Sequence, residues 1–216
     1  PAVAAGGDIV TIKGDFFLGL ESVSFIDAKT GVATEAEIVS STVDEIRVAV
    51  PAGTKVSYIS VTTGGGTVRS TSTFGFNYII YADALNPGWQ NWSWSSEFDY
   101  SSPTVVKSGQ YSYKQTYTGG WGGVQLYGAD LPISEYTALK VSIYGGPGTA
   151  NKEIIVTINW AVQKRITLQQ GKWTDYTISL SDLGNPQTIN VLVFQEVGNT
   201  GGPAPFLMYI DDLGLI

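Results

Sequence analysis

The apolar residues of this chain occur in short runs, and turn-forming residues separate the runs along most of its length. Val, Ile, Thr, Tyr, Phe and Trp recur in stretches of about five to eight residues. No stretch sustains the spacing of three and four residues that gives an amphipathic helix one apolar face. Short runs bounded by Gly, Ser, Asn and Pro are typical of β-strands. The sequence therefore predicts an all-β protein with almost no helix.

The first part of the chain has the strand spacing of a small sandwich. Its strand-like runs lie about eight to twelve residues apart, which is typical of an immunoglobulin-like β-sandwich. A new strand-like run begins after Asn77, and no long Gly, Ser or Pro linker precedes it. We therefore place a domain boundary between residues 77 and 78. The expected strands of this first domain lie in 8–14, 23–26, 45–50, 58–63 and 73–76.

Several short segments of residues 1–77 follow one another in a characteristic order. They are Val-Thr-Ile-Lys-Gly at 10–14, Val-Ser-Phe at 23–25, Ile-Arg-Val-Ala-Val-Pro-Ala-Gly at 46–53 and Ser-Val-Thr-Thr-Gly-Gly-Gly at 60–66. With Phe16, Phe17 and Phe74, this order resembles the IPT/TIG family of immunoglobulin-like domains. The resemblance implies a spacer domain, and we carry over no binding residue from it.

Residues 78–216 contain about ten further strand-like runs. Because no helix is available to cover a single sheet, we expect two antiparallel sheets packed face to face, as in a β-jelly-roll sandwich. The run 153–160 is apolar almost throughout, which favours a central strand. Other expected strands lie in 111–117, 138–144 and 190–194.

Four segments of this second domain form another recognisable series. They are Ile-Tyr-Ala-Asp-Ala-Leu at 80–85 followed by Gly-Trp at 88–89, Val-Lys-Ser-Gly-Gln-Tyr-Ser at 106–112, Thr-Tyr-Thr-Gly-Gly-Trp-Gly-Gly at 116–123 and Met-Tyr-Ile-Asp-Asp-Leu at 208–213. The series resembles the jelly-roll carbohydrate-binding modules of bacterial polysaccharide-degrading enzymes and surface glycan-binding proteins. The resemblance implies non-catalytic polysaccharide binding by a secreted or cell-surface bacterial protein.

Many modules of this kind hold a structural calcium ion, and the resemblance implies where it would lie. Asp83 and Asp212, with backbone carbonyls near residues 107–111, match the calcium-binding positions. Carboxylate and carbonyl oxygens are the ligands that calcium prefers. The alternative is that both residues are ordinary surface or hydrogen-bonded aspartates.

Charge and composition exclude several classes of function. A net charge of -7 with 12 basic residues argues against nucleic acid, which is bound by clustered Lys and Arg. The chain has neither Cys nor His, so disulfides, thiolate or imidazole metal sites and a Ser-His-Asp triad are excluded. No apolar run is long enough for us to expect membrane insertion. Because Pro1 is not a native start, we expect that an N-terminal signal or an upstream domain has been removed. We also expect the chain to be a monomer within a larger multidomain protein.

Tryptophans mark the expected binding region. Residues 86–94 contain three of the six tryptophans, Trp89, Trp92 and Trp94, directly after a Pro-Gly turn signal. An exposed indole ring suits a partner with a flat apolar face, such as a sugar ring. Trp121 lies between pairs of glycines that leave it unshielded. We interpret these four rings as sugar-binding, the alternative being that each belongs to the core.

Strand alternation predicts the polar part of the site. Around Gln125 and Tyr127, the apolar Val124 and Leu126 point to the opposite face, so the amide and the phenol should be available to a ligand. In the run 153–160, Asn159 lies opposite a stripe that ends at Trp160. We therefore expect Asn159 to bind sugar and Trp160 to be structural. A site with so few carboxylates suits a neutral glycan. We expect this glycan to be β-linked, a β-glucan or a related plant cell-wall polysaccharide.

Two other classes of function remain open. A glycoside hydrolase needs two carboxyl groups facing each other across the scissile bond. Glu97 and Asp99 are two apart on one face of a strand and so do not face each other across a substrate. The adjacent Asp211 and Asp212 point to opposite sides of their strand, so neither pair meets this requirement. We therefore expect no enzyme activity. A purely structural or adhesion module is the other alternative, which burial of Trp89 and Trp121 would favour.

Overall fold

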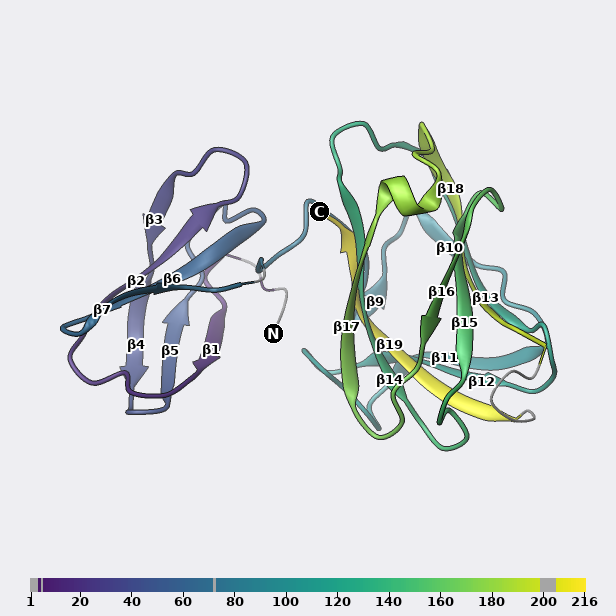
Figure 1. The fold of residues 1–216 in the computed structure, drawn as a ribbon, viewed down its shortest axis with the longest axis horizontal. Coiled ribbons are helices and arrows are strands. Elements are labelled where there is room, and N and C mark those ends of the chain that lie inside the picture. The colour runs from purple at the N-terminus through teal and green to yellow at the C-terminus, as the bar shows by residue number, and fades with distance from the viewer. Residues whose placement is uncertain (1–3, 5, 72, 199–204) are drawn as a thin grey trace. The chain divides into compact units, whose positions relative to one another are not determined.

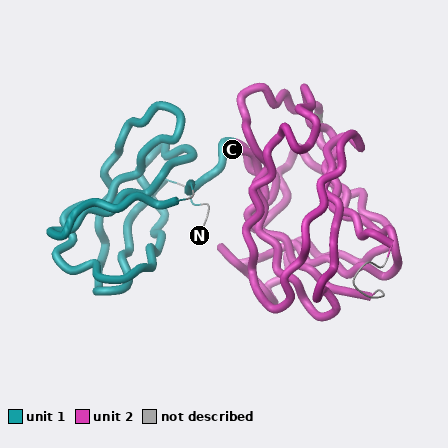
Figure 2. Tube along the Cα trace, viewed as in Figure 1, with its two compact units in different colours: residues 1–77 teal, residues 78–216 magenta. Residues whose placement is uncertain are grey.

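The computed structural model describes residue 4 and residues 6–71, 73–198 and 205–216, and these form an all-β protein (Figure 1). The prediction of two β-sandwiches with almost no helix is confirmed, since the only helical segment described is the 3-10 turn Leu180–Leu183. The chain divides into two compact units, Pro1–Asn77 and Tyr78–Ile216 (Figure 2). Among the described residues, no helix has the length and apolar character needed to cross a membrane.

Unit 1 is an immunoglobulin-like sandwich of two antiparallel sheets. One sheet has the order β1-β5-β4 and the other the order β3-β2-β6-β7. Alternate residues of β2 and β5 fill the space between the sheets, and the Phe25 ring meets the Phe74 ring edge-on at 5.3 Å. The strands are β1 (Ile9–Lys13), β2 (Leu20–Asp27), β3 (Ala33–Glu35), β4 (Glu37–Ser41), β5 (Glu45–Ala49), β6 (Ser57–Thr63) and β7 (Gly66–Arg69).

Unit 2 is a larger sandwich, also of two antiparallel sheets. A five-stranded sheet has the order β10-β13-β18-β15-β16, and a seven-stranded sheet has the order β11-β12-β19-β14-β17 with β8 and β9 added beside β19. Figure 1 shows the two sheets as facing layers. The strands are β8 (Tyr78–Ala82), β9 (Ala84–Leu85), β10 (Trp89–Asn91), β11 (Ser96–Ser102), β12 (Ser112–Tyr117), β13 (Gly123–Pro132), β14 (Ala138–Gly145), β15 (Glu153–Ile158), β16 (Gln163–Thr167), β17 (Trp173–Ser179), β18 (Thr188–Glu196) and β19 (Phe206–Leu215).

The core of unit 2 lies between the inner faces of these sheets. In β15, Ile154, Val156 and Ile158 alternate into the core, as the apolar stripe of the sequence predicts. β15 lies between β18 and β16 and is therefore not an edge strand. Burying one face of each sheet in this way leaves the opposite face of the five-stranded sheet for side chains that are not needed in the core.

Trp89 belongs to this core, which contradicts the prediction that it binds sugar. Its side chain is only 5% exposed, because β10 begins at this residue and points it inward. Its indole Nε1 donates to the Tyr78 hydroxyl at 3.1 Å. The ring also lies against Gly128, where an added Cβ would come within 2.8 Å of it. The predicted turn is present at residues 87 and 88, but Trp89 is already the first residue of β10 and therefore lies in the strand.

We expect Trp89→Ala to lower the free energy of unfolding by about 3–5 kcal/mol, because truncating a buried indole leaves a cavity. Urea denaturation followed by circular dichroism measures this loss. Trp92→Ala is the matched control, since Trp92 is 53% exposed and its removal should cost far less. Equal losses for the two variants would contradict the burial of Trp89.

Candidate functional site

The outer face of the five-stranded sheet carries the side chains that strand alternation points away from the core. Val124 and Leu126 are buried inside, whereas Gln125 and Tyr127 lie on the outer face, as predicted. Tyr127 pairs with Gln90 of the edge strand β10, so these two side chains share that face.

Trp92 and Tyr127 form a stacked pair at the β10 edge of this face. Their ring centroids are 4.4 Å apart and their planes differ by 12°. The indole Nε1 of Trp92 donates to Gln90 Oε1 at 3.2 Å, which fixes the orientation of the ring. Trp92 is 53% exposed and Tyr127 37% exposed, so the pair presents apolar ring surface to solvent.

A second pair of rings lies nearer the middle of the sheet. Trp94 forms a bridge with Gly123, and a Cβ on this glycine would collide with the Trp94 ring. The ring therefore lies on the outer face, where the side chain of residue 123 would otherwise be. Trp94 Nε1 donates to the Trp121 carbonyl at 2.9 Å. The Trp160 ring packs beside Trp94 with 5.7 Å between centroids.

The indole rings of Trp94 and Trp160 explain why several residues on the outer face of the sheet are buried. Val193 and Thr157 lie on the same row of the sheet as Gln125, and Ile155 lies on the same row as Gly123 and Gln195. All three are almost completely buried although they point away from the core. Because Trp94 covers Gly123 on this face and Trp160 packs against Trp94, we attribute this burial to the two indoles.

Trp160 is the aromatic residue that the sequence analysis wrongly assigned to a structural role. β15 ends at Ile158, and Asn159 and Trp160 both have left-handed backbone, with φ of 53° and 59°. The alternation therefore stops before Trp160, and its ring turns to the outer face, where it is 49% exposed. A tryptophan just beyond a buried strand is a weak signal, because the sequence does not show where the strand ends.

Asn159 does not offer its amide to a ligand, which contradicts its predicted role. Its Oδ1 accepts from the backbone amides of Asn190 at 3.1 Å and Val191 at 3.0 Å. Its Nδ2 donates to the Thr188 carbonyl at 2.7 Å. The side chain closes the turn after β15 onto β18, so its role is structural.

The predicted metal ligands lie at the loop 107–111. Asp83 Oδ1 accepts from the amides of Gln110 and Tyr111, both at 2.7 Å, and Asp212 Oδ1 accepts from Ser108 Oγ at 2.7 Å. Asp212 Oδ2 is buried with no hydrogen-bond partner, which leaves a carboxylate oxygen suited to a cation. No group of three Asp, Glu, His or Cys side chains among the described residues forms a metal cluster.

Burial and the neighbouring carboxylate raise the pKa of Asp211 to about 6. Its Oδ2 accepts from the amides of Lys107 and Ser108 at 3.1 and 3.2 Å. Asp211 and Asp212 are therefore both committed to holding this loop. Glu97 and Asp99 lie exposed on β11 of the other sheet. Neither carboxylate pair is on the aromatic face.

Residues 80–216 match the family described as Expansin-like protein C-terminal domain. The match covers more than half of the chain, and it spans both sheets of the sandwich that presents the aromatic face. The chain belongs to this family.

Three solved structures share the β-sandwich architecture. SGBP-B from a complex xyloglucan utilization locus in Bacteroides uniformis aligns with a TM-score of 0.61 and 17% identity, over 100% of this chain and 70% of that one. A crystal structure of domains CD aligns with a TM-score of 0.59 and 18% identity, over 100% and 96%. A crystal structure with xylogluco-oligosaccharide aligns with a TM-score of 0.56 and 20% identity, over 98% and 55%. No curated protein matches the chain.

In this expansin-like domain, a buried ion pair holds Trp121 in place. Trp121 has left-handed backbone with φ of 64°, and its side chain is 56% exposed. Its backbone N–H donates to Glu196 Oε2 at 2.8 Å, and its ring lies against Gly198. Glu196 Oε1 pairs with Lys152 Nζ at 3.4 Å, and both side chains are fully buried. Lys152 Nζ also lies 4.7 Å from the centre of the Phe206 ring. Glu196 and Lys152 are far apart in the chain, so their pairing cannot be predicted from the residues around either one.

We expect Lys152→Met to lower the free energy of unfolding by about 3–5 kcal/mol, because it leaves the Glu196 charge buried without its cation. The double variant Lys152→Met/Glu196→Met should recover most of this loss, since it removes both charges. Lys164→Met is the control: its pair with Asp182 at 2.9 Å is exposed and should be worth less than about 1 kcal/mol. Denaturant titration measures all three variants. Equal small losses for Lys152→Met and Lys164→Met would show that the buried pair is not required.

Proposed function

We propose that unit 2 binds a neutral, β-linked polysaccharide without catalysing its cleavage, and that the aromatic face of the five-stranded sheet is the binding surface. The observation that carries the proposal is the set of exposed rings on this face and at its end. Trp92, Trp121, Tyr127 and Trp160 are exposed, and Trp94, which is half-buried, packs beside Trp160. Sugar C–H groups pack on such ring faces, as one aromatic ring packs on another.

The rings are already ordered before a ligand arrives. Trp92 is held by Gln90 and stacked on Tyr127, and Trp94 is held by the Trp121 carbonyl. Binding therefore has little side-chain entropy to remove, which favours affinity. By analogy with aromatic pairs, each stacked ring would contribute about 0.5–1.5 kcal/mol.

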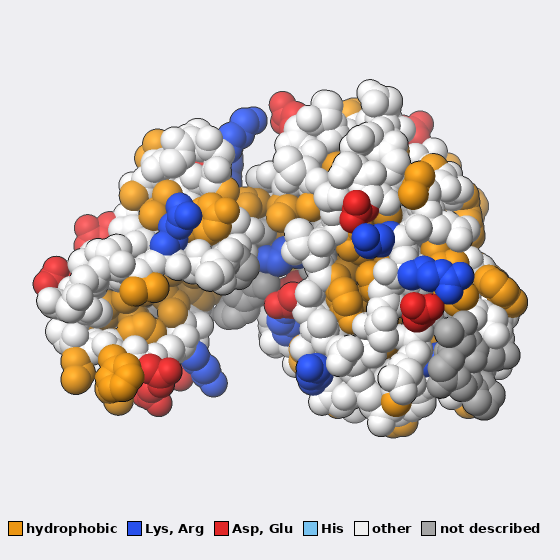
Figure 3. Space-filling view, viewed as in Figure 1, with side chains coloured by type: hydrophobic (Ala, Val, Ile, Leu, Met, Phe, Trp, Pro, Cys, Tyr) orange, Lys and Arg blue, Asp and Glu red, His pale blue; other side chains and the backbone are white. Residues whose placement is uncertain are grey.

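The polar groups of the face suit hydroxyl groups rather than charged sugars. Gln125 points outward between the ring pairs, and Gln195 lies nearby with its Nε2 donating to the Trp121 carbonyl at 3.1 Å. Arg165, which lies opposite Ile155 on this face, pairs with Glu153 at 3.1 Å, and Lys164 pairs with Asp182 at 2.9 Å, so both basic side chains already have a carboxylate partner. On the face seen in Figure 3, charged side chains are scattered, with no broad basic patch. This distribution supports a neutral glycan and argues against nucleic acid.

The similar structures support the β-glucan class and the location. Two of them are described in terms of xyloglucan or xylogluco-oligosaccharide, and one is from Bacteroides. We accordingly propose a secreted or cell-surface bacterial protein in which unit 1 is a spacer of IPT/TIG type. The present chain would act as a monomeric part of a larger multidomain protein. A purely structural or adhesion role is less well supported, because Trp121 is exposed even though Trp89 is buried.

We expect Trp92→Ala, Trp160→Ala and Trp121→Ala each to weaken binding to a soluble β-glucan about tenfold, a loss of roughly 1.4 kcal/mol. Isothermal titration calorimetry at low and high salt measures the affinities. Salt should change them little, because stacking and neutral hydrogen bonds release no counterions. The three variants should still unfold cooperatively, which shows that they remain folded. A reducing-sugar assay should detect no cleavage of the polysaccharide by the unmodified protein. Unchanged affinity in all three variants would place the site elsewhere.

We also propose that a calcium ion stabilises unit 2 at the loop 107–111, held by Asp83 and the unpartnered Oδ2 of Asp212. A divalent cation would offset the repulsion between the adjacent buried carboxylates of Asp211 and Asp212. Its role would be structural, since these residues belong to the seven-stranded sheet and the aromatic face belongs to the five-stranded sheet.

We expect added calcium to raise the melting temperature of the protein and EDTA to reverse the increase, because a ligand that binds only the folded state stabilises it. Differential scanning calorimetry measures the shift. Asp212→Asn should abolish the response to calcium, whereas Asp182→Asn, at an exposed site, should retain it. A melting temperature that is the same in calcium and in EDTA would refute the metal site.

A further inference from the structure

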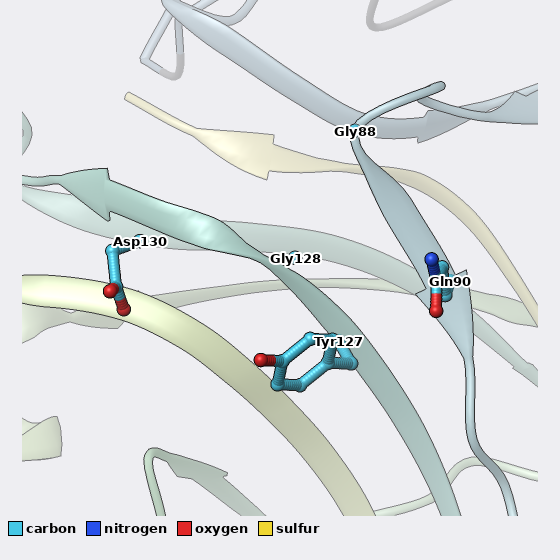
Figure 4. Close-up of a pocket in the computed structure, with 5 residues that line it drawn as sticks. All are labelled: Gly88, Gln90, Tyr127, Gly128 and Asp130. Carbon is cyan, nitrogen blue, oxygen red and sulfur yellow. The ribbon is translucent and has the colours of Figure 1, made fainter.

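A pocket of about 500 Å³ opens beside the Trp92–Tyr127 pair, and the stacking surface does not account for it. It is lined by Gly88, Gln90, Tyr127, Gly128 and Asp130 (Figure 4). The figure shows Tyr127 between Gln90 on one side and Asp130 on the other. The pocket therefore combines a phenol, an amide and a carboxylate at the β10 edge of the aromatic face.

A β-bulge in β13 brings Asp130 to this face. Strict alternation would place residues 127 and 130 on opposite faces of the sheet. The pairing with β18 shifts between Tyr127 and Leu131, so that four steps along β13 correspond to two steps along β18, from Val191 to Ile189. Alternation is interrupted within this segment: Leu131 packs against the core, while Asp130 is exposed and lines the pocket with Tyr127. Bulges commonly redirect a side chain in this way next to functional sites.

The polar groups of the pocket are held in fixed positions with hydrogen-bonding capacity left over. Asp130 Oδ1 accepts from Asn190 Nδ2 at 2.8 Å, and Gln90 Oε1 accepts from Trp92 Nε1 at 3.2 Å. These hydrogen bonds engage Asp130 Oδ1 and Gln90 Oε1, which leaves Asp130 Oδ2 and Gln90 Nε2 to interact with a ligand. A carboxylate oxygen accepts and an amide donates, which together match the hydroxyl groups of a neutral sugar.

The shape of the pocket distinguishes which sugar of a glycan would enter it. The main chain of a polysaccharide bound to the aromatic face would stack on the flat sides of the rings. Gly88 and Gly128 carry no side chain, so the protein backbone forms part of the pocket wall beside the Tyr127 ring. A group that reaches this recess must leave the line of the stacked main chain, as a branch does.

We propose that this pocket binds a neutral sugar branch of the polysaccharide whose main chain stacks on the aromatic face. The proposal rests on the proposed function and adds to it that a branched β-glucan is preferred over an unbranched one. Asp130 is the residue that would determine this preference, by accepting hydrogen bonds from hydroxyl groups of the branch.

The test uses two probes that share one main chain: a xyloglucan oligosaccharide, which has xylosyl branches, and the unbranched cello-oligosaccharide with the same backbone. Calorimetry with the full chain should show at least about tenfold tighter binding of the branched probe. Asp130→Ala should remove this difference by weakening only the branched complex. Asp182→Ala is the matched control and should change neither affinity. Asp182 is an exposed carboxylate bound by one side-chain nitrogen, that of Lys164, as Asp130 is bound by the side-chain nitrogen of Asn190.

The possible failures are distinguishable. Equal affinity of the unmodified protein for the two probes would refute the branch pocket while leaving the stacking function intact. Equal weakening of both complexes by Asp130→Ala would also refute it, because the pocket would then bind the main chain. Full retention of branched-probe affinity in Asp130→Ala would show that the pocket is not used. If neither probe binds and the aromatic variants change nothing, the proposed function itself fails.

Discussion

Contact between tryptophan rings and glycines determines how unit 2 presents its aromatic residues. Trp89 lies against Gly128, Trp94 against Gly123 and Trp121 against Gly198, and in each case an added Cβ would come too close to the indole. The absence of a side chain lets a large flat ring lie directly on the backbone. One of these contacts packs a ring into the core, and the other two help to hold rings at the surface.

This arrangement gives the outer face of the five-stranded sheet its unusual character. A solvent-facing sheet surface ordinarily carries polar side chains, but here Ile155, Thr157 and Val193 are buried on it. Indole rings cover these residues and in turn expose their own far faces. The result is an apolar surface of ordered rings, and stacking of a sugar chain on ordered rings costs little side-chain entropy.

Residues at the ends of strands contribute as much to the candidate site as the strands do. Trp121 and Trp160 both have left-handed backbone, which costs free energy for residues with a side chain. At Trp121, that conformation is supported by the hydrogen bond to Glu196 and by the buried pair of Glu196 with Lys152. At Trp160, the neighbouring Asn159 holds the turn to β18. Buried polar contacts thus stabilise the backbone that directs exposed rings outward.

The sequence by itself determined the all-β class, the core stripe of β15 and the outward direction of Gln125 and Tyr127. The all-β class follows from short apolar runs bounded by turn-forming residues, and the other two follow from the period of two, a local property that any strand must obey. Tertiary structure decided the rest. Trp89 and Trp160 were assigned to the wrong faces because alternation does not show where β10 begins or β15 ends. Asp130 was missed because a bulge resets the alternation, and Glu196 and Lys152 were missed because the fold brings them together from distant strands. The hydrogen bonds that occupy Asn159 likewise come from β18, so no property of the residues around it in the sequence could reveal that its amide is already used.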